Sequence, residues 1–216
     1  MTPVETQERR GEGSETFSPA EAAYVAAVSR KTVDQAIDRG EVEPAPSRRP
    51  DDSQRAVDVG TIVYFRLREQ TGDLLSSEGK RRLYHMLVHR TPDDIPSMIT
   101  IGAISVRTES ALEPVGERLA HLRGVRYFVV SDRGVRGGEP VIRDTRIPVH
   151  TIAEMVAQGV ERDRILAAYP ALTAESLDAA VLYARLHPRR GRPRSAPWRE
   201  NPPVQVFTAE ELGDSR

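Results

Sequence analysis

Residues 129–188 read VVSDRGVRGGEPVIRDTRIPVHTIAEMVAQGVERDRILAAYPALTAESLDAAVLYARLHP. The pairs Val141-Ile142 and Arg146-Ile147 flank the short polar segment Arg143-Asp144-Thr145, and this pattern predicts a tight β-hairpin. In the part that follows, apolar residues recur at spacings of three and four, with two interruptions, as expected for amphipathic helices. The stretch therefore predicts a β-hairpin followed by three helices.

Start and stop signals place these three helices. Pro148 opens the first helix, because the missing N–H of proline costs nothing at a helix start, and Gly159 ends it. The second helix covers residues 162–168. Thr173 has the side chain of a helix cap and begins the third helix.

A second pattern lies near the N-terminus, at residues 17–40. Ser18 caps a short helix that ends at Ala26, and Ala27-Val28 forms a turn. Ser29 caps another helix that continues to Arg39, and Gly40 stops it. The small alanines of the first helix let the two helices approach closely, so we expect a compact pair of helices around a short turn.

The region between these patterns predicts further helices and strands. We expect a Pro- and charge-rich loop at 43–56 and a helix from the Asp58 cap to Thr71-Gly72. A second helix is expected from Ser77 to about His89, with its apolar side chains buried: Leu83, Met86 and Leu87. The Pro-rich break at 91–96 is interpreted as a domain boundary.

Beyond the break, β-branched residues predict a strand at 97–107 and another at 125–130, with a helix at about 114–123 between them. The whole pattern predicts a mainly α fold with minor β structure. We expect a disordered lead at 1–16, a helix-turn-helix domain at 17–93, an α+β domain at 97–187 with a β-hairpin and three helices of winged-helix-like type, and a tail at 188–216.

Composition excludes several classes of protein. The 216 residues include 31 Lys and Arg and 32 Asp and Glu, for a net charge of −1, so nucleic-acid binding must rest on a local basic surface. Without cysteine there can be no disulfide, thiolate zinc site or cysteine nucleophile. No apolar run reaches the roughly 18–20 residues of a membrane span, and the first residues have no apolar signal region. We therefore expect a cytoplasmic protein with no membrane partner.

The second helix of the 17–40 pair carries the candidate DNA-binding residues. A recognition helix places its N-terminal residues in the major groove. The hydroxyls of Ser29 and Thr32 can meet phosphates, while Arg30, Lys31 and Gln35 can contact base edges. A helical hairpin that only builds core is the alternative interpretation.

The stretch SPAEAAYVAAVSRKTVDQAIDRGEV at 18–42 resembles the first helix-turn-helix of excisionase and MerR-type DNA-binding domains. This resemblance implies a DNA-binding role. Asp34 and Asp38 lie on the same predicted helix and reduce its positive field, so a single copy would bind DNA weakly. We therefore expect a homodimer.

The 129–188 stretch resembles the DUF433 family along its whole length. The residues that carry the likeness are Gly137-Gly138, Pro140, Val141-Ile142 and the run Asp144-Thr145-Arg146-Ile147-Pro148-Val149. Asp144 stands where the family usually has glycine, and Asp tolerates the left-handed conformation better than most residues. The family resemblance implies a hairpin followed by a trihelical, DNA-binding-like unit.

The tail at 188–216 begins PRRGRPRSAPWRENPP, which no helix or central strand can contain. Together with the two resemblances above, it makes the chain resemble VapB-type antitoxins that carry DUF433. That resemblance implies a PIN-domain ribonuclease toxin and operator DNA as partners. Clustered arginines could occupy the acidic cleft of the toxin, aromatic residues could anchor the arm, and the alternating apolar residues could pair with a sheet edge. The expected toxin-binding residues are Arg189, Arg190, Arg192, Arg194, Trp198, Arg199, Val204, Val206 and Phe207.

Other interpretations of the same features stay open. The tail could be a solubilising segment or an arm that binds DNA phosphates, and the protein could be a stand-alone regulator without a toxin. His85 and His89, four residues apart on a predicted helix, have no third ligand nearby, so we expect no metal site. We find no arrangement typical of an enzyme and expect no catalytic residues and no cofactor.

Overall fold

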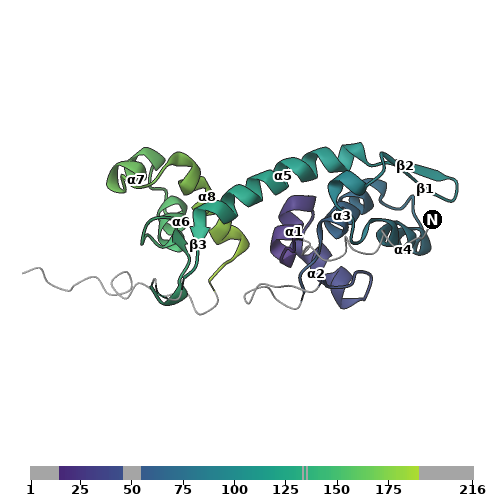
Figure 1. The fold of residues 1–216 in the computed structure, drawn as a ribbon, viewed down its shortest axis with the longest axis horizontal. Coiled ribbons are helices and arrows are strands. Elements are labelled where there is room, and N and C mark those ends of the chain that lie inside the picture. Colours follow the sequence, from purple (N-terminus) through teal and green to yellow (C-terminus); the bar gives the residue numbers. More distant parts are fainter. Residues whose placement is uncertain (1–14, 46–54, 133, 135, 190–216) are drawn as a thin grey trace, which may run out of the picture.

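The computed structural model describes residues 15–45, 55–132, 134 and 136–189. The protein is mainly helical, with two small two-stranded sheets, which confirms the predicted fold class. Figure 1 shows a long helix, α5, that runs from a β-hairpin at one end of the molecule to a group of three helices at the other. Residues 15–128 are called the N-terminal module below, and residues 129–189 the C-terminal module.

The N-terminal module begins with α1 (Pro19–Ala26) and α2 (Arg30–Asp38). The Ser18 hydroxyl accepts the N–H of Glu21, and the Glu21 carboxylate accepts the N–H of Ser18, so α1 starts with a reciprocal capping box. Ser29 caps α2 by accepting the N–H of Thr32. The left-handed backbone at Ala27 turns the chain between the helices, and Gly40 ends the second one with φ of 67°. The predicted helix pair is confirmed.

Helices α3 (Val59–Thr71) and α4 (Ser77–Leu87) follow, and a short 3₁₀ turn, η2 (Pro92–Asp94), comes after them. Gly60 lies directly against the end of α4, where an added Cβ would overlap the carbonyl oxygen of Leu87. The fully buried Asp58 carboxylate caps α3 through the N–H of Thr61 and also accepts the backbone N–H of His89. This bond fixes the chain after α4.

Two expectations for α4 are wrong. The helix ends at Leu87, and His89 has φ of 64°, so His85 and His89 do not share a helix face. The Asp58 carboxylate holds His89 in this turn. Met86 is 38% exposed, because the packed face of α4 carries Leu83 and Leu87 instead.

The single strand expected at 97–107 is a hairpin of β1 (Met98–Ile101) and β2 (Ile104–Arg107), paired antiparallel with Ile99 opposite Val106. The chain reverses at Gly102, whose φ of 61° is readily adopted by glycine. β-branched residues favour strands, but they do not reveal a turn between two short ones.

Helix α5 (Glu109–Phe128) is longer than predicted at both ends. Pro114 lies inside this helix and not at its start. Proline has no N–H to donate to the carbonyl oxygen of Ser110, and this oxygen accepts a hydrogen bond from the side-chain N–H of Gln70 instead. The strand expected at 125–130 is also wrong over its first four residues. Val125 continues the buried stripe of α5, and only β3 (Val129–Val130) is extended.

The C-terminal module starts with β3, a 3₁₀ turn at η3 (Arg136–Gly138) and β4 (Val141–Ile142), which pairs antiparallel with β3. The predicted turn after β4 is present, since the N–H of Ile142 donates to the carbonyl oxygen of Ile147. Asp144 has φ of 61°, so the expected left-handed conformation is confirmed at this position.

Three helices complete the module as predicted: α6 (Val149–Ala157), α7 (Arg162–Ala168) and α8 (Ala174–Leu186). Gly159 adopts φ of 81° in the turn after α6. Thr173 caps α8 by accepting the N–H of Ser176. The start and stop residues read from the sequence therefore predicted the positions of these three helices well.

The apolar residues form two clusters that meet on α8. The larger cluster contains α1 to α5 and the β1–β2 hairpin, together with Ala179, Leu182 and Leu186 of α8. The smaller one packs α6, α7 and the other side of α8, including Leu177 and Ala180. The packing thus passes without a break through the boundary expected at 91–96 and changes where α5 meets β3.

The expected disordered lead also needs correction at its end. Glu15 forms ion pairs with Arg123 (2.8 Å) and Arg126 (2.9 Å), and the carbonyl oxygen of Thr16 accepts a hydrogen bond from Arg126. Folding brings these two arginines of α5 against the chain just before α1. The rest of the lead lies outside the described residues.

Candidate nucleic-acid interface

Helix α2 has one buried face and one exposed face. Val33 and Ala36 are buried against the core. The opposite face carries the residues predicted to contact DNA: Ser29, Arg30, Lys31 and Gln35 are exposed, and Thr32 is half-buried. The structure therefore brings all five predicted residues to the start and the outer side of one helix.

The acidic residues of α2 are matched by basic neighbours. Arg30 forms an ion pair with Asp34 one turn later at 3.4 Å. Arg55, which comes from the far side of the 43–56 loop, lies 2.9 Å from Asp38 and also donates to the backbone carbonyl of Asp34. Lys31 has no ion-pair partner among the described residues. Arg55 thus reduces the negative field that sequence reasoning assigned to this helix.

The 43–56 loop leaves and returns at neighbouring points of the N-terminal module. The N–H of Ala45 donates to the carbonyl oxygen of Ala56, and Phe17 pairs with Val57 in an antiparallel bridge. Residues 46–54 between them lie outside the described part of the chain. The ends of the loop are therefore anchored close to the core, and Arg55 reaches α2 from there.

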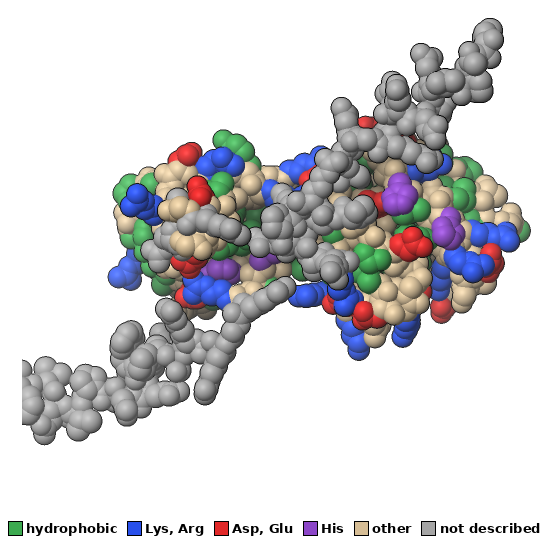
Figure 2. Space-filling model, turned by 60° about the horizontal axis from the view of Figure 1, so that its bottom comes forward, with side chains coloured by type: hydrophobic (Ala, Val, Ile, Leu, Met, Phe, Trp, Pro, Cys, Tyr) green, Lys and Arg blue, Asp and Glu red, His purple; other side chains and the backbone are tan. Residues whose placement is uncertain are grey.

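Basic and acidic side chains are mixed on one face of the molecule. On the face drawn in Figure 2, Lys and Arg side chains lie interspersed with Asp and Glu side chains. This agrees with the net charge of −1. The exposed face of α2 is a small local group of basic side chains that could serve as a nucleic-acid interface.

A buried ionic network joins α1, α5 and α8, and sequence reasoning missed it. Glu21 is 2% exposed, and its carboxylate accepts two hydrogen bonds from Arg126, at 2.9 and 3.1 Å. The guanidinium of Arg126 also lies over the Phe17 ring at 4.7 Å. His187, at the end of α8, lies 3.6 Å from the Glu21 carboxylate. These residues are too far apart in sequence for any local pattern to reveal the network.

The network controls the ionisation of Glu21. Burial alone would raise the pKa of this carboxyl group, but hydrogen bonds from His187, Arg126 and the Ser18 backbone outweigh that effect and lower the pKa from 4.5 to about 2. Glu21 is therefore an anion at neutral pH. It holds the start of α1 against α5 and α8.

The predicted toxin-binding residues fall almost entirely outside the described part of the chain; these are Arg190, Arg192, Arg194, Trp198, Arg199, Val204, Val206 and Phe207. The described exception is Arg189, which was expected to contact the toxin. It forms ion pairs with Glu139 at 2.7 Å and Glu154 at 3.3 Å. Folding of the C-terminal module brings both carboxylates next to the end of α8, so the tail begins at a fixed point on that module.

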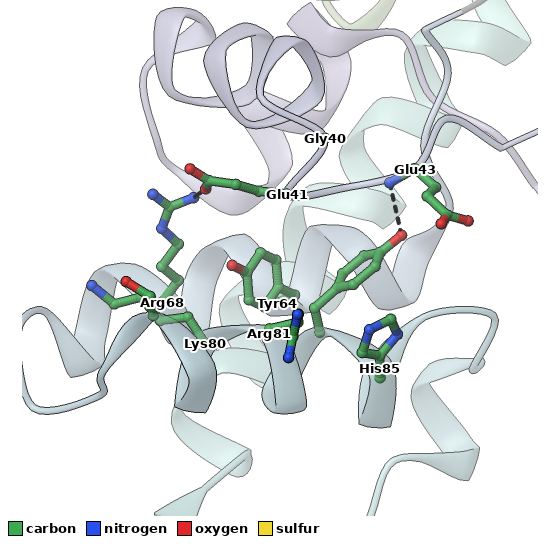
Figure 3. Close-up of a pocket in the computed structure, with 10 residues that line it drawn as sticks. Gly40, Glu41, Glu43, Tyr64, Arg68, Lys80, Arg81 and His85 are labelled. Atoms are coloured by element: carbon green, nitrogen blue, oxygen red, sulfur yellow. Dashed lines mark hydrogen bonds and ion pairs between the residues drawn. The ribbon is translucent and has the colours of Figure 1, made fainter.

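A pocket of about 410 Å³ lies beside the segment that follows α2 (Figure 3). Its walls come from residues 40–43 on one side and from α3 and α4 on the other. The polar groups around it are a mixture of both signs, including Arg68, Lys80 and Glu41. No pattern in the sequence pointed to this pocket, because its walls come from three separate segments.

Among the residues that the structure describes, no three His, Asp or Glu side chains gather in a way that could hold a metal ion. Within the same residues, no helix combines the length and the apolar character needed to cross a membrane.

Comparisons with known proteins each match a part of the chain. Residues 129–184 match the family described as "Protein of unknown function (DUF433)". One curated relative, "Uncharacterized protein y4eO" of Sinorhizobium fredii (strain NBRC 101917 / NGR234), is 45% identical over 78 residues, which are 36% of this chain and 35% of that protein. The chain thus spans about a third of the length of this relative.

One solved structure also matches, the crystal structure of a DUF433 member protein from Anabaena variabilis ATCC 29413. It is 39% identical in sequence, with a TM-score of 0.28, and the match covers 35% of this chain and 75% of that chain. The chain described here carries a DUF433 domain at residues 129–184.

Proposed function

We propose that this protein is a cytoplasmic antitoxin of a type II toxin–antitoxin system. In this proposal, α2 binds operator DNA and represses the shared operon, and the tail at 188–216 neutralises a PIN-domain ribonuclease toxin. The observation that carries the proposal is the outer face of α2, where Arg30, Lys31 and Gln35 are exposed together at the start of a helix.

The DNA-binding part follows from the chemistry of that face. Arginine and lysine contact phosphates and guanine, and glutamine can bond adenine in the major groove. Arg30 can leave Asp34 for a phosphate, because the pair is exposed and such surface pairs contribute little stability. Arg55 already compensates Asp38, so binding to DNA does not have to overcome that charge.

The small size of the basic face supports a dimer in this proposal. One α2 helix supplies only a few phosphate contacts, and affinity for DNA depends steeply on their number. Two copies would present two helices to half-sites about one helical turn apart. Operator DNA with two such half-sites would therefore be the preferred target.

The toxin-binding part rests on the resemblance to antitoxins that carry DUF433 and on the chemistry of the tail. Guanidinium groups suit the carboxylates of a metal-dependent ribonuclease, and Trp198 is the single tryptophan of the chain. Arg189 anchors the start of this segment on the C-terminal module. The folded body would then present the tail from a defined position.

A stand-alone DNA-binding regulator is the second candidate. One observation favours it: Arg189 is paired with Glu139 and Glu154 of its own chain, so a toxin would have to displace these carboxylates to bind the first arginine of the tail. In this case the neighbouring gene would not encode a PIN-domain protein, and the tail would have no toxin to bind.

The DNA-binding part is tested with the double variant Arg30→Ala, Lys31→Ala and a fragment of the promoter upstream of the gene. We expect binding at least about tenfold weaker and a smaller salt dependence, by up to about 1.8 in the slope of log K against log salt. The control removes two exposed arginines of α7, Arg162→Ala with Arg164→Ala, and should bind as the wild type does. Equal binding by both double variants would show that α2 is not the DNA-binding helix.

The toxin part is tested by truncation after Arg189, which preserves its ion pairs with the folded body. The truncated chain should still bind promoter DNA but should no longer rescue cells that express the neighbouring ribonuclease. The single substitution Trp198→Ala should weaken the complex by about 2 kcal/mol. Rescue of growth by the truncated chain, with unchanged affinity for the toxin, would assign the neutralising role to the folded body.

A further inference from the structure

The pocket beside α2 is large enough for a small molecule. Its volume of about 410 Å³ falls within the range of roughly 300–1,000 Å³ that is usual for ligand sites. It is not a gap in one helix interface, because residues 40–43, α3 and α4 each contribute walls (Figure 3). The chemistry of these walls determines which ligand fits.

Helix α4 lines the pocket with one continuous face. The residues of this face recur at helical spacing and are Ser77, Lys80, Arg81, Tyr84 and His85. Lys80 is half-buried and has no ion-pair partner among the described residues. Arg81 is exposed, and its partner Glu78 does not line the pocket. This wall therefore presents positive charge that the protein does not neutralise inside the pocket.

The acidic residues of the opposite wall do not cancel that charge. Glu41 is held by Arg68 at 2.8 Å and by Arg39 at 3.8 Å. Figure 3 shows the Glu41–Arg68 pair at one side and Glu43 at the other, with its carboxylate directed away from Lys80 and Arg81. The N–H of Glu43 donates to the Tyr84 hydroxyl, which fixes this wall to α4.

Aromatic rings form the base of the pocket. The centroids of Tyr64 and Tyr84 lie 5.4 Å apart in an edge-to-face arrangement, and His85 follows Tyr84 at another 5.4 Å. Tyr64 and Tyr84 are 2% and 3% exposed, so the exposed His85 offers most of the ring surface that a flat ligand can contact. The pocket thus combines an aromatic base with a cationic side.

We propose that this pocket binds a small organic anion that contains a flat ring. The anionic group lies against Lys80 and Arg81, and the ring packs near Tyr64, Tyr84 and His85. The two glutamates that line the pocket, Glu41 and Glu43, could instead suggest a site for a divalent cation. The ion pair of Glu41 with Arg68 opposes the binding of a cation there. This inference does not rest on the proposed function.

The test uses indole-3-acetate and its neutral analogue indole-3-acetamide, titrated into the full-length protein by calorimetry and by NMR of the tyrosine and histidine rings. The acetate should bind saturably, and at least about tenfold more tightly than the amide, as one charge-assisted hydrogen bond predicts. No saturable binding of the acetate, or equal binding of both compounds, would overturn the proposal.

Two variants of α4 locate the site. Lys80→Gln should weaken binding of the acetate about tenfold and leave binding of the amide unchanged. The control Arg82→Gln removes a charge of the same helix that does not line the pocket, and should bind the acetate normally. Circular dichroism of both variants checks that the fold is intact. Equal effects of the two variants would show that the anion is attracted by the overall charge of α4 and not bound in the pocket.

Discussion

The two modules of this protein are stabilised in different ways. In the N-terminal module, two carboxylates are buried and hydrogen-bonded, Asp58 at 1% and Glu21 at 2% exposure, and the Arg126 side chain that binds Glu21 is 13% exposed. In the C-terminal module, the ion pairs lie at the surface, as between Arg162 and Asp178, and a smaller apolar cluster forms the core. Helix caps and turns occur in both modules, but the buried long-range ionic contacts lie in the first one.

Helix α8 of the C-terminal module packs into the apolar clusters of both modules. Leu182 and Leu186 pack into the larger cluster, while Leu177 packs into the smaller one. His187, just after α8, reaches the Glu21 carboxylate of α1. A change in the position of α8 would therefore affect both the DUF433 domain and the base of the α1–α2 pair.

The largest difference between the modules should appear when one carboxylate is removed from each. Glu21→Gln takes a buried charge from Arg126 and should lower the free energy of unfolding by about 3 kcal/mol. Asp178→Asn removes an exposed partner of Arg162, at 54% exposure, and should cost less than about 1 kcal/mol. Urea unfolding of both variants measures the two values, and equal losses would contradict the distinction drawn between the modules.

Acid should act on the N-terminal module through the same carboxylate. The pKa of Glu21 is about 2 in the folded protein, against 4.5 for the ordinary group. Because the folded value is the lower one, the stabilisation is complete above pH 4.5 and is lost as the pH falls towards 2, by up to about 3 kcal/mol.

Unfolding free energies measured between pH 5 and pH 2 compare the wild type with Glu21→Gln. The variant cannot gain this proton, so its stability should fall less steeply over the same range. Identical slopes would mean that Glu21 does not carry the effect.

Substitution of glycine by alanine should also cost different amounts of stability in the two modules. Gly60→Ala forces a Cβ onto the Leu87 carbonyl and should cost about 2–3 kcal/mol, because backbone must move. Gly159→Ala in the C-terminal module meets nothing within 4 Å but has φ of 81°, so it should cost about 1 kcal/mol through backbone strain. Thermal unfolding measures the loss of stability in both variants.

Gly124 of α5 is a different case, because it has open space around it and a helical backbone. Gly124→Ala should therefore raise the free energy of unfolding by about 0.5–1 kcal/mol.

The smallest effects concern the hairpin turn of the DUF433 domain. Asp144 has φ of 61°, a conformation that a β-branched residue adopts poorly, so Asp144→Val should cost about 1–2 kcal/mol. Asp144→Gly relieves the strain but adds entropy to the unfolded chain, so its effect should stay within about 1 kcal/mol. If both variants melt at the wild-type temperature, the turn does not constrain the module.

Much of the fold was predictable, because many of its signals are local. The caps at Ser18, Ser29 and Thr173 and the turns at Gly40 and Gly159 involve residues within a few positions of one another. Their hydrogen bonds depend only on backbone geometry and near neighbours. The same holds for the five residues predicted on α2, whose exposed face follows from helical periodicity.

The middle of the chain was predicted less well, because packing overrides local preference there. β-branched Val125 favours a strand, yet it continues a helix since its side chain completes the stripe that α5 buries. Pro114 favours a helix start, yet Gln70 from α3 bonds the carbonyl oxygen that proline leaves free. Neither neighbour is visible in a local window of sequence.

The helices with clear caps, the turns and the DUF433 stretch at 129–188 could be identified from the sequence alone, because these depend on interactions over a few residues. Only the tertiary structure decided that Arg126 binds Glu21, that Arg55 compensates Asp38, and that Arg189 is held by Glu139 and Glu154. It also decided that three segments enclose a pocket beside α2. Such pairings join residues far apart in the chain, and charge alone does not select one partner among the many acidic and basic residues present.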